Sequence, residues 1–100
     1  SGSGPAYVFL LAEAMEAAGI AQGLPADAAR TLVVQTLLGA SRMLDEAGES
    51  PAELRRRVTS PNGTTQAAIE SFQADGFELL VGKALRAAQQ RGRELSAAND

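Results

Sequence analysis

Apolar residues recur along most of this chain at the spacing of helical turns, and no stretch alternates between apolar and polar positions as a half-buried strand would. The first helical segment follows Pro5, a residue that suits the first turn of a helix. Its apolar face comprises Tyr7, Leu11, Met15 and Ala18. Glu13 and Glu16 are expected on the side that faces water, and Gly19 is expected to end the helix.

A second helix is predicted over residues 25–47, the longest of the chain, with Gly48 after its end. Between residues 31 and 44 its only charged residue is Arg42, so an apolar surface reaches most of the way round. Such a helix is expected to be buried on several sides. A monomer of this size has too few other helices to surround it, whereas a dimer that wraps it has enough. Gly39 lowers helix propensity in mid-helix, and we expect close packing there.

Three further helices are predicted in the second half of the chain. They cover residues 52–57, residues 64–74 and residues from 77 onward. Ser50-Pro51-Ala52-Glu53 is a capping box that opens the first of them. Asp75-Gly76 is expected to end the second, while the third turns polar from Gln89 and frays at Asn99-Asp100. The predicted fold class is all-α, with about five helices of unequal length.

The run Val58-Thr59-Ser60-Pro61-Asn62-Gly63-Thr64-Thr65 collects turn formers and hydroxyls without an apolar period. Pro61 restricts the backbone and Asn62-Gly63 tolerates positive φ, so a sharp turn is expected. Thr64 and Thr65 then stand at a helix start, where unpaired N–H groups and the helix dipole favour an anion. The pattern predicts a small pocket for a carboxylate or phosphate. The alternative is a capping threonine that binds no ligand.

Composition indicates that a monomer would have a thin core. Hydrophobic residues make up 45% of the chain, but twenty of them are alanine and only 4% of residues are aromatic. Alanines let helices approach closely but bury little area each. We therefore expect helix faces to be buried against a second copy of the chain.

Several kinds of chemistry are excluded by missing residue types. The chain has no cysteine and no histidine, which removes thiolate ligands, the commonest metal ligand and the usual general base. No metal-binding residue is therefore predicted. The chain also has no glycine-rich dinucleotide motif after a strand, so no cofactor-binding residue is predicted. The net charge of −3 argues against nucleic acid. The longest strictly apolar run, residues 6–12, is too short to span a membrane, and no signal segment opens the chain, so a soluble cytoplasmic protein is expected.

Arg55, Arg56 and Arg57 lie in the last turn of the predicted short helix, where cations complement the helix dipole. The acidic total favours a solvated helix end. A nucleic-acid-binding patch is one alternative. An arginine that faces an anion near Thr64-Thr65 is another.

Six segments carry a resemblance to a known family. They are Ser1-Gly2-Ser3-Gly4-Pro5-Ala6-Tyr7, the helix led by Pro25, Ser50-Pro51-Ala52-Glu53-Leu54, residues 58–65, Phe77, and Arg91-Gly92-Arg93-Glu94-Leu95. In order and spacing they resemble pyrroline-5-carboxylate reductase. The resemblance covers only that family's C-terminal, all-helical dimerisation domain. It implies that residues 1–100 form this domain, interlocked with a second chain, and that the N-terminal Rossmann domain is absent.

The family reduces 1-pyrroline-5-carboxylate to L-proline with NADPH or NADH, and its loop pattern Ser-Pro-Gly-Gly-(Thr/Ala)-Thr falls on residues 60–65. By resemblance, Ser60 and the backbone amides of Gly63, Thr64 and Thr65 hold the substrate carboxylate. The Thr65 hydroxyl contacts the ring nitrogen and helps to protonate it, which makes Thr65 the implied catalytic residue. The implied active site lies between the helical body and the cofactor domain.

Asn62 stands where the family pattern has glycine. Because asparagine tolerates left-handed φ, the turn is expected to survive, although the side chain can narrow the pocket. The implied whole enzyme is a homodimer or higher oligomer that binds 1-pyrroline-5-carboxylate and L-proline. For this chain alone we expect no NADPH or NADH binding and no turnover. The alternative function is a helical assembly module that only dimerises and binds no ligand without its cofactor domain.

Overall fold

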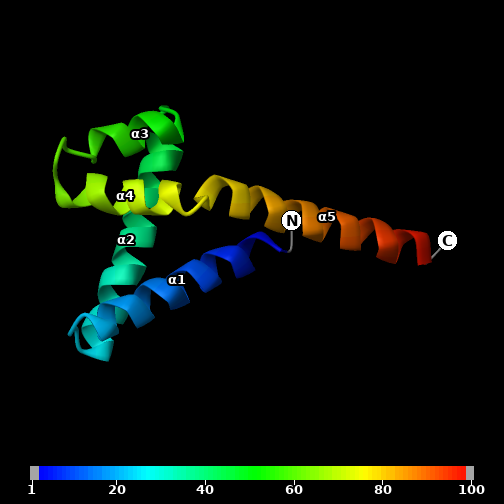
Figure 1. Ribbon diagram of the computed structural model, residues 1–100, viewed down its shortest axis with the longest axis horizontal. Helices are drawn as coiled ribbons and strands as arrows, with labels where there is room; N and C mark the ends of the chain where they lie inside the picture. Colours follow the sequence, from blue (N-terminus) through cyan, green and yellow to red (C-terminus); the bar gives the residue numbers. More distant parts are fainter. Residues whose placement is uncertain (1–2, 99–100) are drawn as a thin grey trace. The chain divides into compact units, whose positions relative to one another are not determined.

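The computed structural model describes residues 3–98, and within that range the chain is helical, without a strand. Its helices are α1 (Gly4–Ala21), α2 (Ala26–Glu46), α3 (Pro51–Arg57), α4 (Thr64–Ala74) and α5 (Phe77–Ala98) (Figure 1). The all-α prediction is confirmed. The resemblance at Ser1-Gly2 and the predicted fraying of Asn99-Asp100 lie outside the described residues. The chain divides into two compact units, Ser1–Leu54 and Arg55–Asp100, each of which is described by itself.

In the first unit, α1 packs against α2 through small residues. A Cβ atom added to Gly19 would lie 3.6 Å from the Cβ of Ala29 and 3.3 Å from Cδ1 of Leu24. Ala29 is only 1% exposed, and Val33, one turn further along α2, is also buried. Glycine and alanine therefore allow a close approach that larger side chains would prevent.

The helix α1 continues past Gly19 to Ala21, so the predicted end at Gly19 is wrong. It ends in a Schellman motif, in which the N–H of Gly23 donates to the carbonyl of Ile20 and the N–H of Leu24 donates to the carbonyl of Gly19, both at 3.0 Å. Gly23 has a φ of 109°, which residues with a side chain rarely adopt. The prediction chose the wrong glycine because Gly19 serves close packing and Gly23 serves the turn.

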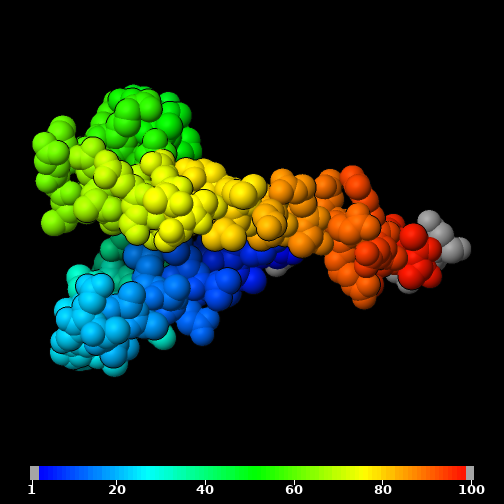
Figure 2. Space-filling view, viewed as in Figure 1, coloured from blue at the N-terminus to red at the C-terminus, as the bar shows by residue number. Residues whose placement is uncertain are grey.

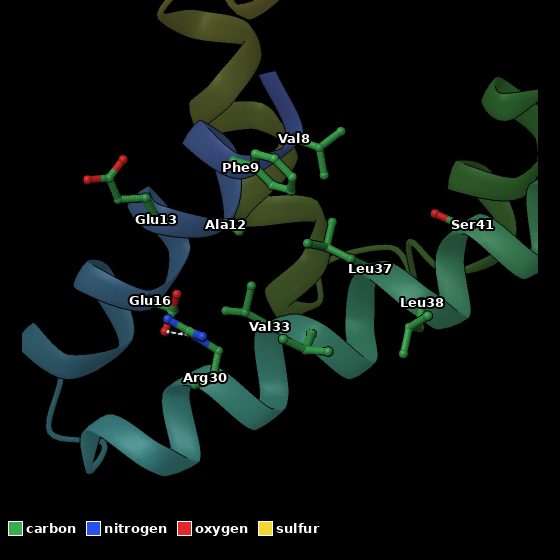
Figure 3. A pocket seen from close by; sticks show the side chains of 11 residues that line it. Val8, Phe9, Ala12, Glu13, Glu16, Arg30, Val33, Leu37, Leu38 and Ser41 are labelled. Carbon is green, nitrogen blue, oxygen red and sulfur yellow. Dashed lines mark hydrogen bonds and ion pairs between the residues drawn. The ribbon is translucent and has the colours of Figure 1, made fainter. Parts of the chain in front are cut away.

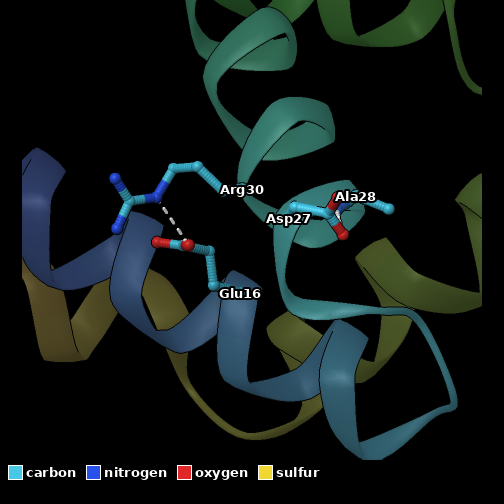
Figure 4. A network of polar contacts seen from close by, with 4 residues as sticks. All are labelled: Glu16, Asp27, Ala28 and Arg30. Atoms are coloured by element: carbon cyan, nitrogen blue, oxygen red, sulfur yellow. Dashed lines mark hydrogen bonds and ion pairs between the residues drawn. The ribbon is translucent and has the colours of Figure 1, made fainter.

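Glu16 faces α2, and the prediction that it lies on the water-facing side is wrong. Its side chain is 20% exposed and accepts a hydrogen bond from Nε of Arg30 at 2.6 Å (Figure 4). Ala12, Glu16 and Gly19 are half-buried at helical spacing, so they form the side of α1 that meets α2. The predicted apolar face is left exposed instead, and its members are Tyr7, Leu11, Met15 and Ala18.

The boundaries of α2 agree with the prediction to within one residue. The helix follows Pro25, and Asp27 in its first turn accepts the N–H of the next residue at 2.9 Å (Figure 4). With 21 residues, α2 is shorter than the 22-residue α5, so the prediction that it is the longest helix is wrong. The polar tail from Gln89 extends α5 because exposed Arg, Glu and Ala residues are good helix formers.

The serine half of the predicted capping box before α3 is confirmed. The side-chain oxygen of Ser50 accepts the N–H of Glu53 at 3.1 Å. Pro51 occupies the first helical position, where its missing N–H leaves no unpaired donor.

In the second unit, α4 contacts α5 at the short connection that joins the two helices. Gly76, within this connection, has a φ of 81°. The rings of Phe72 and Phe77 meet edge to face across it, with centroids 5.2 Å apart and planes at 67°. The predicted helix end at Asp75-Gly76 and helix start at Phe77 are therefore confirmed.

Burial is very limited throughout the described residues. Among the described residues only Ala29, Val33 and Leu54 are buried. Within the first unit α1 contacts α2, and within the second unit α4 contacts α5. Large apolar side chains stay exposed, Phe9 at 70% and Leu79 at 63%. Figure 2 shows α5 with side chains in open view along its orange-to-red length, and no residue of α5 is buried. This agrees with the expectation of a thin core.

Candidate substrate loop and association surfaces

The loop between α3 and α4 is built on a tight turn over residues 60–63. The N–H of Gly63 donates to the carbonyl of Ser60 at 3.1 Å. Pro61 holds the second position of this turn, and Asn62 holds the third with a φ of 62°. This combination is typical of a type II turn, which needs a positive φ at its third position. The prediction that asparagine can sustain the turn is confirmed.

Gly63 is the N-cap of α4, and its carbonyl accepts the first helical bond from the N–H of Ala67 at 3.2 Å. A Cβ atom at this position would lie 3.3 Å from the carbonyl oxygen of Ser60, so glycine suits this close approach. No side-chain hydrogen bond caps the helix. The interpretation of Thr64 or Thr65 as a mere cap is therefore wrong, because these residues occupy the first two helical positions.

The start of α4 offers backbone donors to solvent. The N–H groups of Thr64, Thr65 and Gln66 precede the first helical bond, and the described part of the chain provides them with no acceptor. Both threonines are exposed, as is Ser60. Together with the positive end of the helix dipole, these donors can accommodate an anion.

Side chains tie this loop to the helices at both of its ends. The hydroxyl of Thr59 donates to the carbonyl of Arg55 in α3 at 2.5 Å. At the other end, the N–H of Asn62 donates to the side-chain oxygen of Gln66 in α4. The turn is thus hydrogen-bonded to a helix at each of its ends.

An open hollow of about 480 Å³ lies beside the loop. Its lining is Arg55, Arg56, Thr59, Pro61, Gln66, Ile69, Glu70 and Gln73. Thr64 and Thr65 are not among these residues, so the structure does not bring the arginines and the two threonines into one hollow. Glu70 also lines it, which leaves the hollow mixed in charge.

A second hollow, of about 570 Å³, lies between α1 and α2 (Figure 3). Its lining is Val8, Phe9, Ala12, Glu13, Glu16, Arg30, Val33, Val34, Leu37, Leu38 and Ser41. The residues are mostly apolar and come from both helices, so this groove offers a surface for another apolar helix. We call it the α1–α2 groove.

Helix α2 is also apolar away from the α1–α2 groove. Leu32, Gly39 and Met43 follow one another at seven and four residues, which places them on one helical face. Leu32 is 55% exposed and Met43 45%. No atom within 4 Å would meet a Cβ at Gly39, so the close packing predicted there is not supplied by the described part of this chain.

Residues 3–98 offer neither a metal cluster nor a membrane span. They contain no group of three or more acidic residues that could hold a metal ion. None of their helices is long and apolar enough to cross a bilayer.

A chain made only of helices in its described range, with a minimal core and with exposed apolar faces on α1, α2 and α5, defines an oligomerisation domain. The family model described as pyrroline-5-carboxylate reductase dimerisation matches residues 1–95. The chain therefore belongs to the pyrroline-5-carboxylate reductase family, in its dimerisation domain.

Relatives agree with this family assignment. Pyrroline-5-carboxylate reductase of Pseudomonas aeruginosa is 62% identical over 96 residues, which cover 96% of this chain and 35% of that protein. The Glycine max enzyme of the same name is 47% identical over 96 residues, again 96% of this chain and 35% of that protein. The chain thus spans about a third of the length of the curated relatives it matches.

Solved structures agree with the fold. A pyrroline-5-carboxylate reductase from Coxiella burnetii aligns with a TM-score of 0.91 at 47% identity, covering 95% of this chain and 35% of that one. Plasmodium falciparum pyrroline carboxylate reductase, solved with NADP bound, aligns with a TM-score of 0.85 at 34% identity, covering 88% of this chain and 36% of that one. In both cases the similarity covers about a third of the solved chain.

Sequence reasoning missed the roles of Glu16 and Gln66. The only signal at Glu16 is that Glu13 and Glu16 are the charged residues of an otherwise apolar helix, for which an ion-pair partner can be sought. Gln66 carries a clearer one, because glutamine at the third helical position commonly accepts a backbone N–H at the helix start. The signal is incomplete in this sequence, since the N-cap is Gly63 rather than serine or threonine, and the donor is Asn62, one residue before the N-cap.

Proposed function

We propose that this chain is the dimerisation and substrate-binding domain of an NAD(P)H-dependent enzyme that reduces 1-pyrroline-5-carboxylate to L-proline. The observation that carries the proposal is the start of α4, where exposed hydroxyls and unpaired N–H groups converge in a chain of this family. Such a helix start suits the carboxylate that substrate and product share.

Within this proposal, the hydroxyl of Ser60 and the N–H groups of Thr64 and Thr65 bind the substrate carboxylate. The N–H of Gly63 is already used by the carbonyl of Ser60, so its part is to shape the turn. Asn62 maintains that turn because its own backbone is in the left-handed conformation, and in this proposal it borders the substrate.

The Thr65 hydroxyl is the proposed catalytic group. Reduction adds a hydride to the imine carbon and a proton to the ring nitrogen, so a hydroxyl donor at that nitrogen acts mainly in the transition state. The hydroxyl is exposed and does not cap α4, which leaves it available for this role.

The hydride is supplied by a nicotinamide cofactor, and the Plasmodium falciparum relative was solved with NADP bound. The residues described here do not fit such a cofactor, because they are all in helices and loops and lack the strand-to-helix phosphate-binding turn. We therefore assign no residue of this chain to the cofactor.

The proposed partner is a second copy of this chain. The exposed apolar faces of α1, α2 and α5 are too extensive for a monomer in water, and the matching family is named for dimerisation. In an interlocked homodimer each copy covers the faces that the other leaves open.

A second candidate is an assembly module that dimerises and binds no small molecule by itself. The small core favours this candidate, because the most extensive feature of the described residues is exposed apolar surface that suits association with another chain. In this case the loop becomes a site only when a cofactor domain is present.

Calorimetry with L-proline, on the isolated domain and on an intact reductase that carries it, distinguishes the two. The proposed function requires that the intact enzyme binds L-proline and oxidises NADPH or NADH with 1-pyrroline-5-carboxylate. If the intact enzyme binds L-proline and the isolated domain does not, the isolated domain is an assembly module. An intact enzyme without this turnover would overturn the proposed function.

A further inference from the structure

The side chain of Gln66 holds the substrate loop from the helix side. Gln66 is the third residue of α4, and its Oε1 accepts the N–H of Asn62. In an ordinary capping box the side chain at the third helical position accepts the N–H of the N-cap, and a serine or threonine N-cap returns the bond. Here the N–H of the N-cap Gly63 donates to Ser60, and Gln66 accepts the N–H of Asn62, one residue earlier. Here the N-cap is Gly63, which has no side chain, so the bond from Asn62 to Gln66 is the side-chain tie at this end of the loop.

Packing restricts where the Gln66 side chain can lie. It is half-buried and lines the same hollow as Thr59, Pro61 and Ile69. The far end of the loop is tied by the Thr59 hydroxyl to the carbonyl of Arg55. A turn held at both ends presents the Thr64 and Thr65 donors in one arrangement, which lowers the conformational cost of binding a ligand.

The bond acts on the one non-glycine residue with positive φ in the described chain. Asn62 has a φ of 62°, a conformation that is less favourable for a residue with a side chain than for glycine. An acceptor on its own N–H stabilises that conformation directly. The left-handed conformation of Asn62 is therefore stabilised by the side chain of Gln66.

We infer that Gln66 is a positioning residue, which holds the Ser60–Gly63 turn through Asn62 and so sets the geometry of the substrate-binding donors. Its effect on binding rests on the proposed function. The bond itself does not, so it can be tested apart from catalysis.

The test uses an intact reductase that carries this domain, with Gln66→Met, Gln66→Glu and Gln73→Met. Methionine keeps the shape of glutamine but removes the strong acceptor. Glutamate keeps an acceptor. Gln73 is the matched control, because it lines the same hollow from α4 but its side chain donates to Glu78, at 3.3 Å, and not to the loop.

Hydrogen–deuterium exchange of the peptide covering residues 58–66 measures the bond. Loss of one hydrogen bond should speed exchange of the Asn62 amide by about five- to tenfold in Gln66→Met. Gln66→Glu and Gln73→Met should exchange like the parent protein. Unchanged exchange in Gln66→Met would overturn the inference, whether or not the enzyme is active.

Kinetics then measure the consequence. In Gln66→Met, KM for 1-pyrroline-5-carboxylate should rise by about five- to tenfold with kcat changed less, while Gln73→Met leaves both near the parent values. In Gln66→Glu, KM should rise at low ionic strength and recover with salt, because an added negative charge repels a bound anion. Faster exchange with an unchanged KM would reduce Gln66 to a structural role. A parent enzyme without turnover refutes the proposed function and leaves the exchange result to decide the bond.

Discussion

The hydroxyl groups of Thr64 and Thr65 belong to adjacent residues at the start of α4, and their proposed roles differ. Neither caps the helix, because Gly63 holds that position. Both expose their side chains in the single chain. If substitution of Thr64 and substitution of Thr65 have different effects on the activity of a reductase that carries this domain, the difference therefore reports on contact with the substrate rather than on helix stability.

We expect Thr65→Ala to lower kcat and kcat/KM together by about 10²-fold or more, because it removes a proton donor that acts in the transition state. The free energy of unfolding should change by no more than about 0.5 kcal/mol, as for other exposed positions. Steady-state kinetics and thermal unfolding of the intact enzyme measure both quantities.

Thr64→Ala is the control for this substitution. It keeps the backbone N–H of residue 64 but loses the hydroxyl, so kcat should stay within a few-fold of the parent value. A Thr65→Ala enzyme with normal kcat and a sharply lower melting temperature would return Thr65 to a purely structural role.

At the scale of an element, α2 is the helix that a single chain leaves most incomplete. One side of it forms the α1–α2 groove, and another side carries Leu32, Gly39 and Met43 in the open. Glycine in the interior of a helix costs about 1 kcal/mol relative to alanine. Its presence there is accounted for if a partner helix approaches the Gly39 backbone.

Gly39→Ala distinguishes a packed face from a free one. If the face is packed by the second copy, the added methyl should weaken dimerisation, measured by sedimentation over a range of protein concentrations. On a free face, the same change should stabilise the protein by about 1 kcal/mol through helix propensity alone. Gly92→Ala in α5, where a Cβ would also meet no atom within 4 Å, is the matched control.

At the scale of the whole molecule, the three buried residues found within residues 3–98 are too few for an independently stable chain of this length. We expect an obligate dimer, so that dissociation and loss of helicity occur together. A stable, folded monomer at micromolar concentration in sedimentation would contradict this expectation.

Leu37→Asp should prevent assembly, because it places an unpaired charge in the α1–α2 groove. Leu37 is half-buried within its own chain, so Leu38→Asp is needed beside it. Leu38 lines the same groove but is 54% exposed, and its substitution acts chiefly on contact with the partner.

Catalysis by the whole molecule is expected to need a cofactor domain. The isolated chain should not oxidise NADPH or NADH with 1-pyrroline-5-carboxylate, because no described residue forms a dinucleotide site. Fusion of a compatible Rossmann domain before the chain should restore measurable activity in a spectrophotometric assay. Turnover by the isolated chain would show that the domain assignment is mistaken.

The sequence by itself determined the helical class, most helix boundaries, the serine half of the capping box at Ser50 and the turn at Asn62. These features depend on interactions within about four residues, such as helix propensity, caps and the φ preferences of Gly, Asn and Pro. The family resemblance was readable for the same reason, since its loop pattern is contiguous in the chain. A thin core was also visible from the alanine content.

Only the tertiary structure decided which residues meet across elements. Glu16 and Arg30 lie fourteen residues apart, and their contact depends on how α1 crosses α2. The use of Gly19 for close packing against Ala29 likewise depends on how α1 crosses α2. Such pairings depend on three-dimensional packing, to which local sequence preferences contribute little.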